Sequence, residues 1–128
     1  MNKNNIFNSS DVVSIYTSDE ATEDGILFDL SKSSFFKNEH FNFVTTNLLS
    51  DLNILSFSSK LNSDVINTPM LLDLLEQAKR IVLNKIRETL TEDTFYSGIV
   101  RSQDNQSIRI FICQNETGLF TLMLPSDY

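Results

Sequence analysis

The decisive stretch of this sequence is TPMLLDLLEQAKRIVLNKIRETL, which covers residues 68–90. Its apolar residues recur at steps of three and four, the spacing that places side chains along one side of an α-helix. They are Leu71, Leu74, Leu75, Ala78, Ile81, Val82, Ile86 and Leu90. Thr68 suits the N-cap and Pro69 suits the first helical position. A helix of about 22 residues is roughly 33 Å long, so we expect it to span the domain and to face the core with this stripe.

Three strands are predicted after this helix, at Phe95–Arg101, Ser107–Cys113 and Leu119–Leu124. Aromatic and β-branched residues are frequent in them, as is typical of strands. Polar residues at 103–106 and 115–118 separate the three, and Gly118 suits the left-handed position of a short hairpin loop. Because short turns join antiparallel neighbours, the end of the chain predicts a three-stranded antiparallel meander.

A β-α-β unit is predicted at the other end of the chain. Residues 12–16 are β-branched and aromatic and favour a strand. Thr17 and Glu20 then have the form of a capping box for a short helix, about 18–24, which Gly25 ends. Residues 26–30 favour a second strand.

The middle of the sequence predicts a helix that begins at Thr45 or Thr46 and continues through Asn53. Its apolar stripe consists of Val44, Leu48, Leu49 and Leu52. Residues 56–63 are polar and rich in serine, which favours a surface loop.

A phenylalanine-rich segment precedes that helix, with Phe35, Phe36, Phe41 and Phe43 among nine positions. We expect these rings to plug the edge of the core from a loop or a short helix. The alternative is an exposed anchor for a partner protein, because aromatic side chains dominate the binding energy of interfaces.

These elements predict one α+β domain over residues 11–128. The order is β-α-β, then two helices of which the second is long, then the three-stranded antiparallel meander. The economical architecture is a single mixed or antiparallel sheet with the long helix packed on one face. Residues 1–10, rich in Asn and Ser, predict a mobile N-terminus.

The composition limits the possible functions. With 41% hydrophobic residues, the 128-residue chain can build a core. Its one cysteine, Cys113, excludes an internal disulfide and is expected to be a buried, unreactive thiol. The sequence contains no run of about 18 apolar residues, so we expect no membrane span. The first residues lack the apolar segment of a signal peptide, so we expect the protein to be located in the cytoplasm. No catalytic, cofactor or metal motif is found, so we expect no enzyme, no cofactor and no metal.

The net charge of −7 points to a class of partner. Direct binding of nucleic acid or of an anionic membrane depends on clustered basic side chains, so both are disfavoured. A protein with a basic surface fits the sign of the charge.

The acidity is concentrated near the beginning of the sequence, where residues 5–31 contain no Lys or Arg. The acidic residues there are Asp11, Asp19, Glu20, Glu23, Asp24 and Asp29. One interpretation is an ordinary solvated helix with acids in its first turns. The functional hypothesis is a negative face that binds a basic groove on a partner. The predicted partner-binding residues are Asp19, Glu20, Glu23, Asp24, Asp29, Phe35 and Phe36.

Two other classes of function remain open. One is a small-ligand or enzymatic site near Tyr16, Asp24 and Asp29, where two carboxylates could serve acid–base chemistry. The other is a self-assembling structural module that uses a free sheet edge. The acids lack the spacing of a calcium-binding loop, so a metal site is disfavoured.

Two segments carry a family resemblance. They are YTSDEATEDGILFDL, residues 16–30, and FTLMLPSD, residues 120–127. They resemble the opening and the closing strand of a family of small uncharacterised proteins from bacteria, phages, plasmids and other mobile elements. The likeness extends over residues 11–128, but Ser18 stands where members usually have Arg, and the tryptophans common in members are absent.

The resemblance implies a genomic setting and no activity. Together with the small size and the acidity, it suggests an accessory protein of a phage or mobile element that works by protein–protein binding in the bacterial cytoplasm. The specific hypothesis is an inhibitor of a nucleic-acid-targeting host defence system, of anti-CRISPR or anti-restriction type. Such a protein would be a monomer or a homodimer and would bind a nucleic-acid-handling defence complex.

Overall fold

The computed structural model of the chain describes residue 22 and residues 24–128. Its elements are, in chain order, β1 (Leu27–Asp29), the 3-10 turn η1 (Leu30–Lys32), β2 (Phe41–Thr45), α2 (Thr46–Asp51), β3 (Leu55–Ser58), β4 (Ser63–Ile66), α3 (Thr68–Thr89), β5 (Phe95–Arg101), β6 (Ser107–Gln114), β7 (Phe120–Met123) and the 3-10 turn η2 (Pro125–Asp127). The mixed α+β class with a long helix is confirmed. The strand predicted at 12–16 and the capping box of Thr17 and Glu20 lie outside the described residues.

The main sheet has, among the residues described, five strands in the order β1-β2-β7-β6-β5. All neighbours are antiparallel except β2 and β7, which are parallel. The three strands expected at the end of the chain are present as β5, β6 and β7, but they are only part of this sheet. The prediction of a single sheet is wrong, because β3 and β4 form a separate two-stranded sheet.

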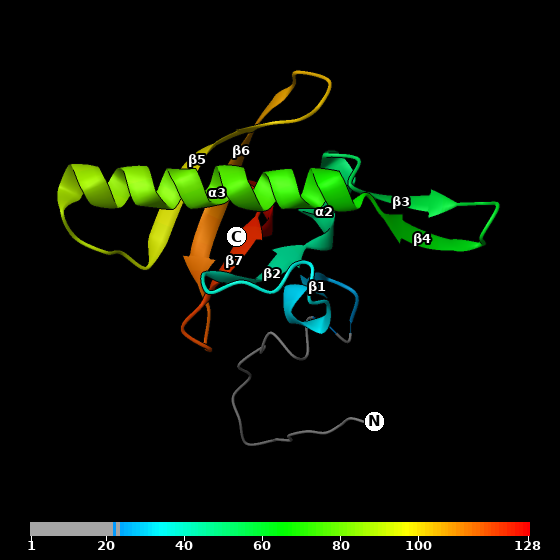
Figure 1. Ribbon diagram of the computed structural model, residues 1–128, viewed down its shortest axis with the longest axis horizontal. Coiled ribbons are helices and arrows are strands. Elements are labelled where there is room, and N and C mark those ends of the chain that lie inside the picture. Colours follow the sequence, from blue (N-terminus) through cyan, green and yellow to red (C-terminus); the bar gives the residue numbers. More distant parts are fainter. Residues whose placement is uncertain (1–21, 23) are drawn as a thin grey trace.

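The β3–β4 hairpin replaces the surface loop that was predicted for residues 56–63. It projects from the body beyond the N-terminal end of α3 (Figure 1). Its strands pair antiparallel from Leu55 opposite Ile66 to Ser58 opposite Ser63. Its first strand, Leu55–Ser58, does alternate apolar and polar residues, but this signal is short and the mostly polar residues 59–64 follow it directly, which favoured a loop.

Strand β2 was also missed, and it contains two of the four phenylalanines. Phe41 and Phe43 are 2% and 5% exposed, and the register with β7 shifts between them. This bulge interrupts the period of two that identifies a strand in sequence. With Phe36 also buried, most of the cluster belongs to the core as expected.

Helix α3 covers one face of the main sheet (Figure 1). Buried residues of the sheet and of α3 form one core, including Leu71, Leu74, Leu75, Ala78, Tyr96, Val100, Ile110, Ile112 and Leu122. Helix α3 packs tightly on β5 at Gly98, where an added Cβ would lie 2.7 Å from Cδ1 of Ile81. A larger residue at this position would push α3 away from the sheet.

Several element ends differ from the prediction. The N-cap of α3 is Asn67 and not Thr68, because the Asn67 side chain accepts from the Met70 amide at 3.1 Å. Helix α2 ends at Asp51, and Asn53 follows in the left-handed conformation. The strand expected at 26–30 is shorter, because Leu30 begins η1.

No helix in the described part of the chain is long and apolar enough to cross a membrane.

Candidate functional site

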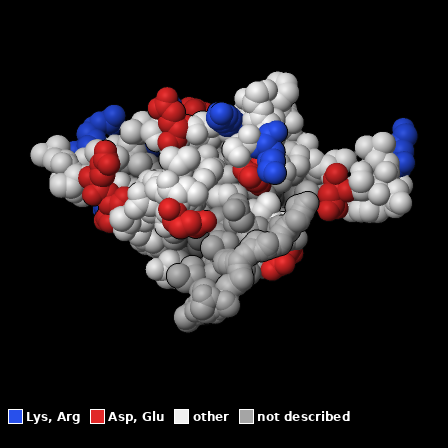
Figure 2. All heavy atoms as spheres, turned by 90° about the horizontal axis from the view of Figure 1, so that it is seen from below, with Lys and Arg blue, Asp and Glu red and all other residues white. Residues whose placement is uncertain are grey.

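The predicted acidic face lies largely outside the described residues, which include neither Asp19, Glu20 nor Glu23. Asp24 is exposed in the turn before Gly25, whose φ of 78° agrees with the expected helix stop. On the face shown in Figure 2, acidic side chains form separate groups with uncharged surface between them. The described part of this face therefore carries no continuous acidic patch.

Asp29 has a structural role. Its carboxylate accepts hydrogen bonds from the Ser31 amide at 2.9 Å and from the Ser31 hydroxyl at 2.6 Å. It is thereby the N-cap of η1 and turns the chain away from the sheet after β1. A carboxylate committed to a cap is a weaker candidate for a partner or for acid–base chemistry.

The two adjacent phenylalanines have opposite positions. Phe36 is 7% exposed and packs edge-on against Phe28, with 6.2 Å between the ring centroids. Phe35 is 75% exposed. Only Phe35 can therefore act as the exposed aromatic anchor that the sequence suggested for both.

Phe35 borders a groove between residues 35–41 and α3. Its lining residues are Phe35, Phe36, Lys37, Asn38, Glu39, His40, Phe41, Leu72, Leu75, Glu76 and Lys79. We call this the Phe35 groove, and its volume is about 540 Å³. Of the predicted site residues, it brings together only Phe35 and Phe36.

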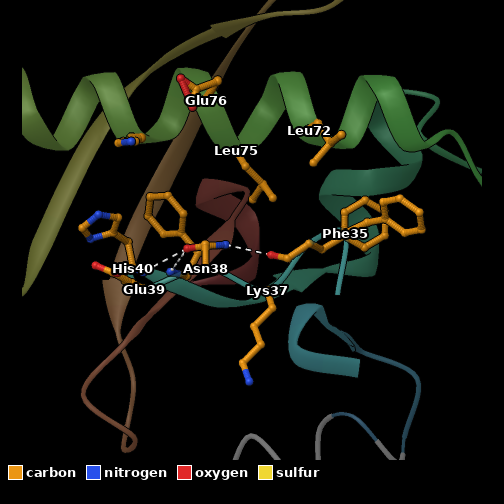
Figure 3. Close-up of a pocket in the computed structure, with 11 residues that line it drawn as sticks. Phe35, Lys37, Asn38, Glu39, His40, Leu72, Leu75 and Glu76 are labelled. Atoms are coloured by element: carbon orange, nitrogen blue, oxygen red, sulfur yellow. Dashed lines mark hydrogen bonds between the residues drawn. The ribbon is translucent and has the colours of Figure 1, made fainter. Parts of the chain in front are cut away.

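The floor of the groove is apolar. Phe36, Phe41 and Leu75 are buried beneath it, and Leu72 on α3 remains 40% exposed. Figure 3 shows Leu72 and Leu75 directed from α3 toward the loop that carries Phe35. Exposed apolar surface next to a buried floor is the arrangement in which a partner side chain gains most from desolvation.

Asn38 holds the loop in shape. Its Oδ1 accepts from the amides of His40 and Phe41 at 2.9 and 2.7 Å, and its Nδ2 donates to the Phe36 carbonyl at 2.9 Å. These bonds, visible in Figure 3, engage both the oxygen and the nitrogen of the side-chain amide. Asn38 therefore orders the groove and is poorly placed to bind a ligand as well.

The rim of the groove carries charges of both signs. Lys37 and Glu39 lie on the loop, while Glu76 and Lys79 lie on α3, and all four are exposed. Figure 3 shows the Lys37 side chain directed away from the helix. An apolar centre with a mixed, solvated rim is typical of a protein-binding surface.

The alternative site near Tyr16, Asp24 and Asp29 gains no support. Tyr16 lies outside the described residues, and neither aspartate lines the Phe35 groove. Within the described residues, no group of three or more His, Cys, Asp or Glu could hold a metal ion.

Cys113 is half-buried on β6, and its Sγ lies 3.9 Å from Sδ of Met123. Desolvation by burial raises the pKa of the thiol above its ordinary value. A raised pKa reduces the thiolate population, which agrees with the expected unreactive thiol.

The sequence prediction missed the helix side of the groove. Leu72, Glu76 and Lys79 follow at steps of four and three, so they share one side of α3 next to the apolar stripe. Leu72 could have indicated this side of the groove, because it is an apolar residue of the helix that lies outside the core-facing stripe. The loop that faces it is distant in sequence, so only the fold shows that the two meet.

Comparison of the chain with protein-family models, curated proteins and solved structures gave no match.

Proposed function

We propose that this protein acts by binding another protein, and that the Phe35 groove is the contact surface. The observation that carries the proposal is the 75% exposure of Phe35 next to the apolar floor of the groove. Isolated exposed apolar side chains are common, but Phe35 adjoins exposed Leu72 and a hollow that can receive a partner side chain. The proposal assigns no catalysis, cofactor or metal to the protein.

The charges support a protein rather than a small molecule as the occupant. Small-ligand sites enclose their ligand and direct a few free polar groups toward it. Here the polar group at the centre of the loop, Asn38, is used by internal hydrogen bonds. The remaining polar groups are the exposed His40 ring and the charged side chains on the rim, where the charges select a partner by complementarity.

A direct test compares two exposed phenylalanines. Phe35→Ala should weaken binding of the partner by about thirtyfold or more, the loss expected of a hot-spot aromatic. Phe57→Ala is the matched control, because Phe57 is 62% exposed on the β3–β4 hairpin, away from the groove. Partners captured by affinity purification from the producing cells would be identified, and their affinities for both purified variants measured. Equal binding by Phe35→Ala and the wild type would contradict the proposal.

The narrower form of the proposal concerns the class of partner. The net charge of −7 and the resemblance to proteins of mobile elements support a partner with a basic surface, such as a nucleic-acid-handling defence complex of the bacterial cytoplasm. In this form the protein is an anti-CRISPR or anti-restriction inhibitor.

Charge reversal tests the narrower form. Asp19, Glu20, Glu23 and Asp24 would be changed together to Lys, and Glu88, Glu92, Asp104 and Glu116 would be changed together as a control with the same net charge. We expect only the first variant to lose inhibition of the defence nuclease. If both variants lose it equally, the effect is one of total charge and the acidic face is not the binding surface. If neither does, the acidic-face mechanism is wrong, and the groove is tested separately by Phe35→Ala.

A further inference from the structure

The main sheet ends in an open edge at β5. Within the described residues, this strand pairs only with β6. The flanking bonds, from the Gln114 amide to the Thr94 carbonyl and from the Ser102 amide to the Gln106 carbonyl, show that even-numbered residues direct their backbone groups toward β6. Phe95, Ser97, Ile99 and Arg101 therefore direct theirs outward.

Gln77 of α3 closes one end of this edge. Its Nε2 donates to the Arg101 carbonyl at 2.9 Å, and its Oε1 accepts from the Arg101 amide at 2.8 Å. The side chain thus imitates a neighbouring strand at one residue. Three residues, Phe95, Ser97 and Ile99, keep outward amide and carbonyl groups without a protein partner in the described part of the chain.

Nothing in residues 95–99 protects the edge. Proteins usually blunt such edges with proline, lysine, a bulge or a very short strand. This segment is FYSGI, and it pairs with β6 without a register shift. At the opposite end of the sheet as the structure describes it, β1 has only three residues and turns directly into η1.

We infer that β5 pairs antiparallel with β5 of a second copy of this chain, around a two-fold axis at Ser97. Ser97 is the midpoint of the free segment, so this register uses every outward group. Ser97 pairs with Ser97 of the second copy, and Phe95 pairs with Ile99 in both directions. The two five-stranded sheets then become one continuous sheet of two copies.

The side chains are self-complementary in this register. Phe95 and Ile99 are 37% and 50% exposed and lie on the face of β5 away from α3, so each would cover the other across the axis. Phe95 also packs with Phe111 and Tyr128, at centroid distances of 4.9 and 5.7 Å, which extends the apolar surface.

The charges of Arg101 and Asp93 are also complementary in this two-fold register. Extending this register past the paired segment brings Asp93 of the second copy toward Arg101, whose outward backbone groups Gln77 already holds, so only the two side chains can meet there. In the described part of the chain neither side chain has an ion-pair partner, and one oxygen of the Asp93 carboxylate accepts from the Thr94 amide at 2.7 Å. The symmetric register therefore adds an Arg–Asp pair at each end, which favours a second copy over an unrelated strand.

The test measures the association of the full chain by analytical ultracentrifugation. The wild type should form a concentration-dependent dimer, and Ile99→Lys should be monomeric at concentrations where the wild type is dimeric. Phe57→Lys, which changes an exposed apolar strand residue of the hairpin, should dimerise like the wild type. A monomeric wild type, a dimeric Ile99→Lys, or a dimer lost only in Phe57→Lys would overturn the inference.

Two further measurements separate strand pairing from any other dimer. Exchange of the Phe95, Ser97 and Ile99 amides with deuterium should slow as the concentration rises, and unchanged exchange in a dimer would overturn the inference. Asp93→Arg and Arg101→Asp should each weaken the dimer by a few-fold, up to about tenfold, and the double exchange should restore it. A double variant no tighter than either single variant would argue against this register.

Discussion

The two halves of α3 carry the same apolar stripe, yet they are buried to different extents. In the first half, Leu71, Leu74, Leu75 and Ala78 are all at most 9% exposed. In the second half, Ile81, Val82 and Ile86 are only partly buried, and Leu90 at the C-cap is 84% exposed. Figure 1 shows the last turns of the helix extending past the strands. Periodicity in a sequence thus shows which side of a helix faces inward, but not how much of that side is covered.

The largest expected loss of stability comes from a leucine in the first half of α3, and it is compared with the loss from an isoleucine in the second half. Leu74→Ala should reduce the free energy of unfolding by about 3 kcal/mol, because it leaves a cavity in a closed core. Ile86→Ala should cost only about 1 kcal/mol, because the partly buried site loses less apolar contact. Urea unfolding measures both, and equal losses would show that the second half is as well packed as the first.

The second effect tests the packing of Ile81 of α3 against Gly98 of β5. Gly98→Ala should cost about 1–2 kcal/mol, since three atoms of Ile81 lie within 2.9 Å of the new Cβ position. Ile81→Ala removes those atoms, so the double variant should be more stable than the sum of the two single losses predicts. Additive losses in a double-mutant cycle would rule out this contact as the cause.

A third effect concerns the start of the helix. Asn67→Ala should cost about 1 kcal/mol, because the Met70 amide loses its capping acceptor. Thr68→Ala is the control, and it should change the midpoint of thermal unfolding much less. A larger loss of stability in Thr68→Ala than in Asn67→Ala would show that Thr68 is the N-cap, as the sequence suggested.

The smallest effect concerns the other end of the helix. Leu90 is the C-cap with φ of 61°, a left-handed conformation that glycine adopts without strain. Leu90→Gly should therefore stabilise the protein by about 0.5 kcal/mol, despite the greater freedom of glycine in the unfolded chain. A lower midpoint of thermal unfolding would mean that the Leu90 side chain contributes more than its exposure suggests.

The parts of the fold that could be predicted from the sequence are those with local signals. The stripe of α3, the three strands after it and the positive φ of Gly25 and Gly118 all follow from neighbouring residues. Strand β2 was hidden by its bulge, and the β3–β4 hairpin was hidden because the alternation of β3 covers only four residues next to a polar segment.

The candidate site was predictable only in part. The phenylalanine cluster identified one wall of the groove, but sequence could not separate exposed Phe35 from buried Phe36, since that depends on which ring reaches Phe28. Asp29 was taken as a surface acid, whereas its two bonds to Ser31 make it a cap. The wall formed by Leu72 on α3 depends on long-range packing, which no local pattern encodes.

The position of β7 has a consequence for synthesis on the ribosome. It is the last of the five strands to be made, yet it lies in the middle of the sheet between β2 and β6. The β1–β2 and β5–β6 pairs can each form earlier, but they have no common neighbour until residues 120–123 emerge. Until then β2 can pair with β1 but lacks its parallel partner β7, so Phe41 and Phe43 are open to aggregation before the central strand is in place.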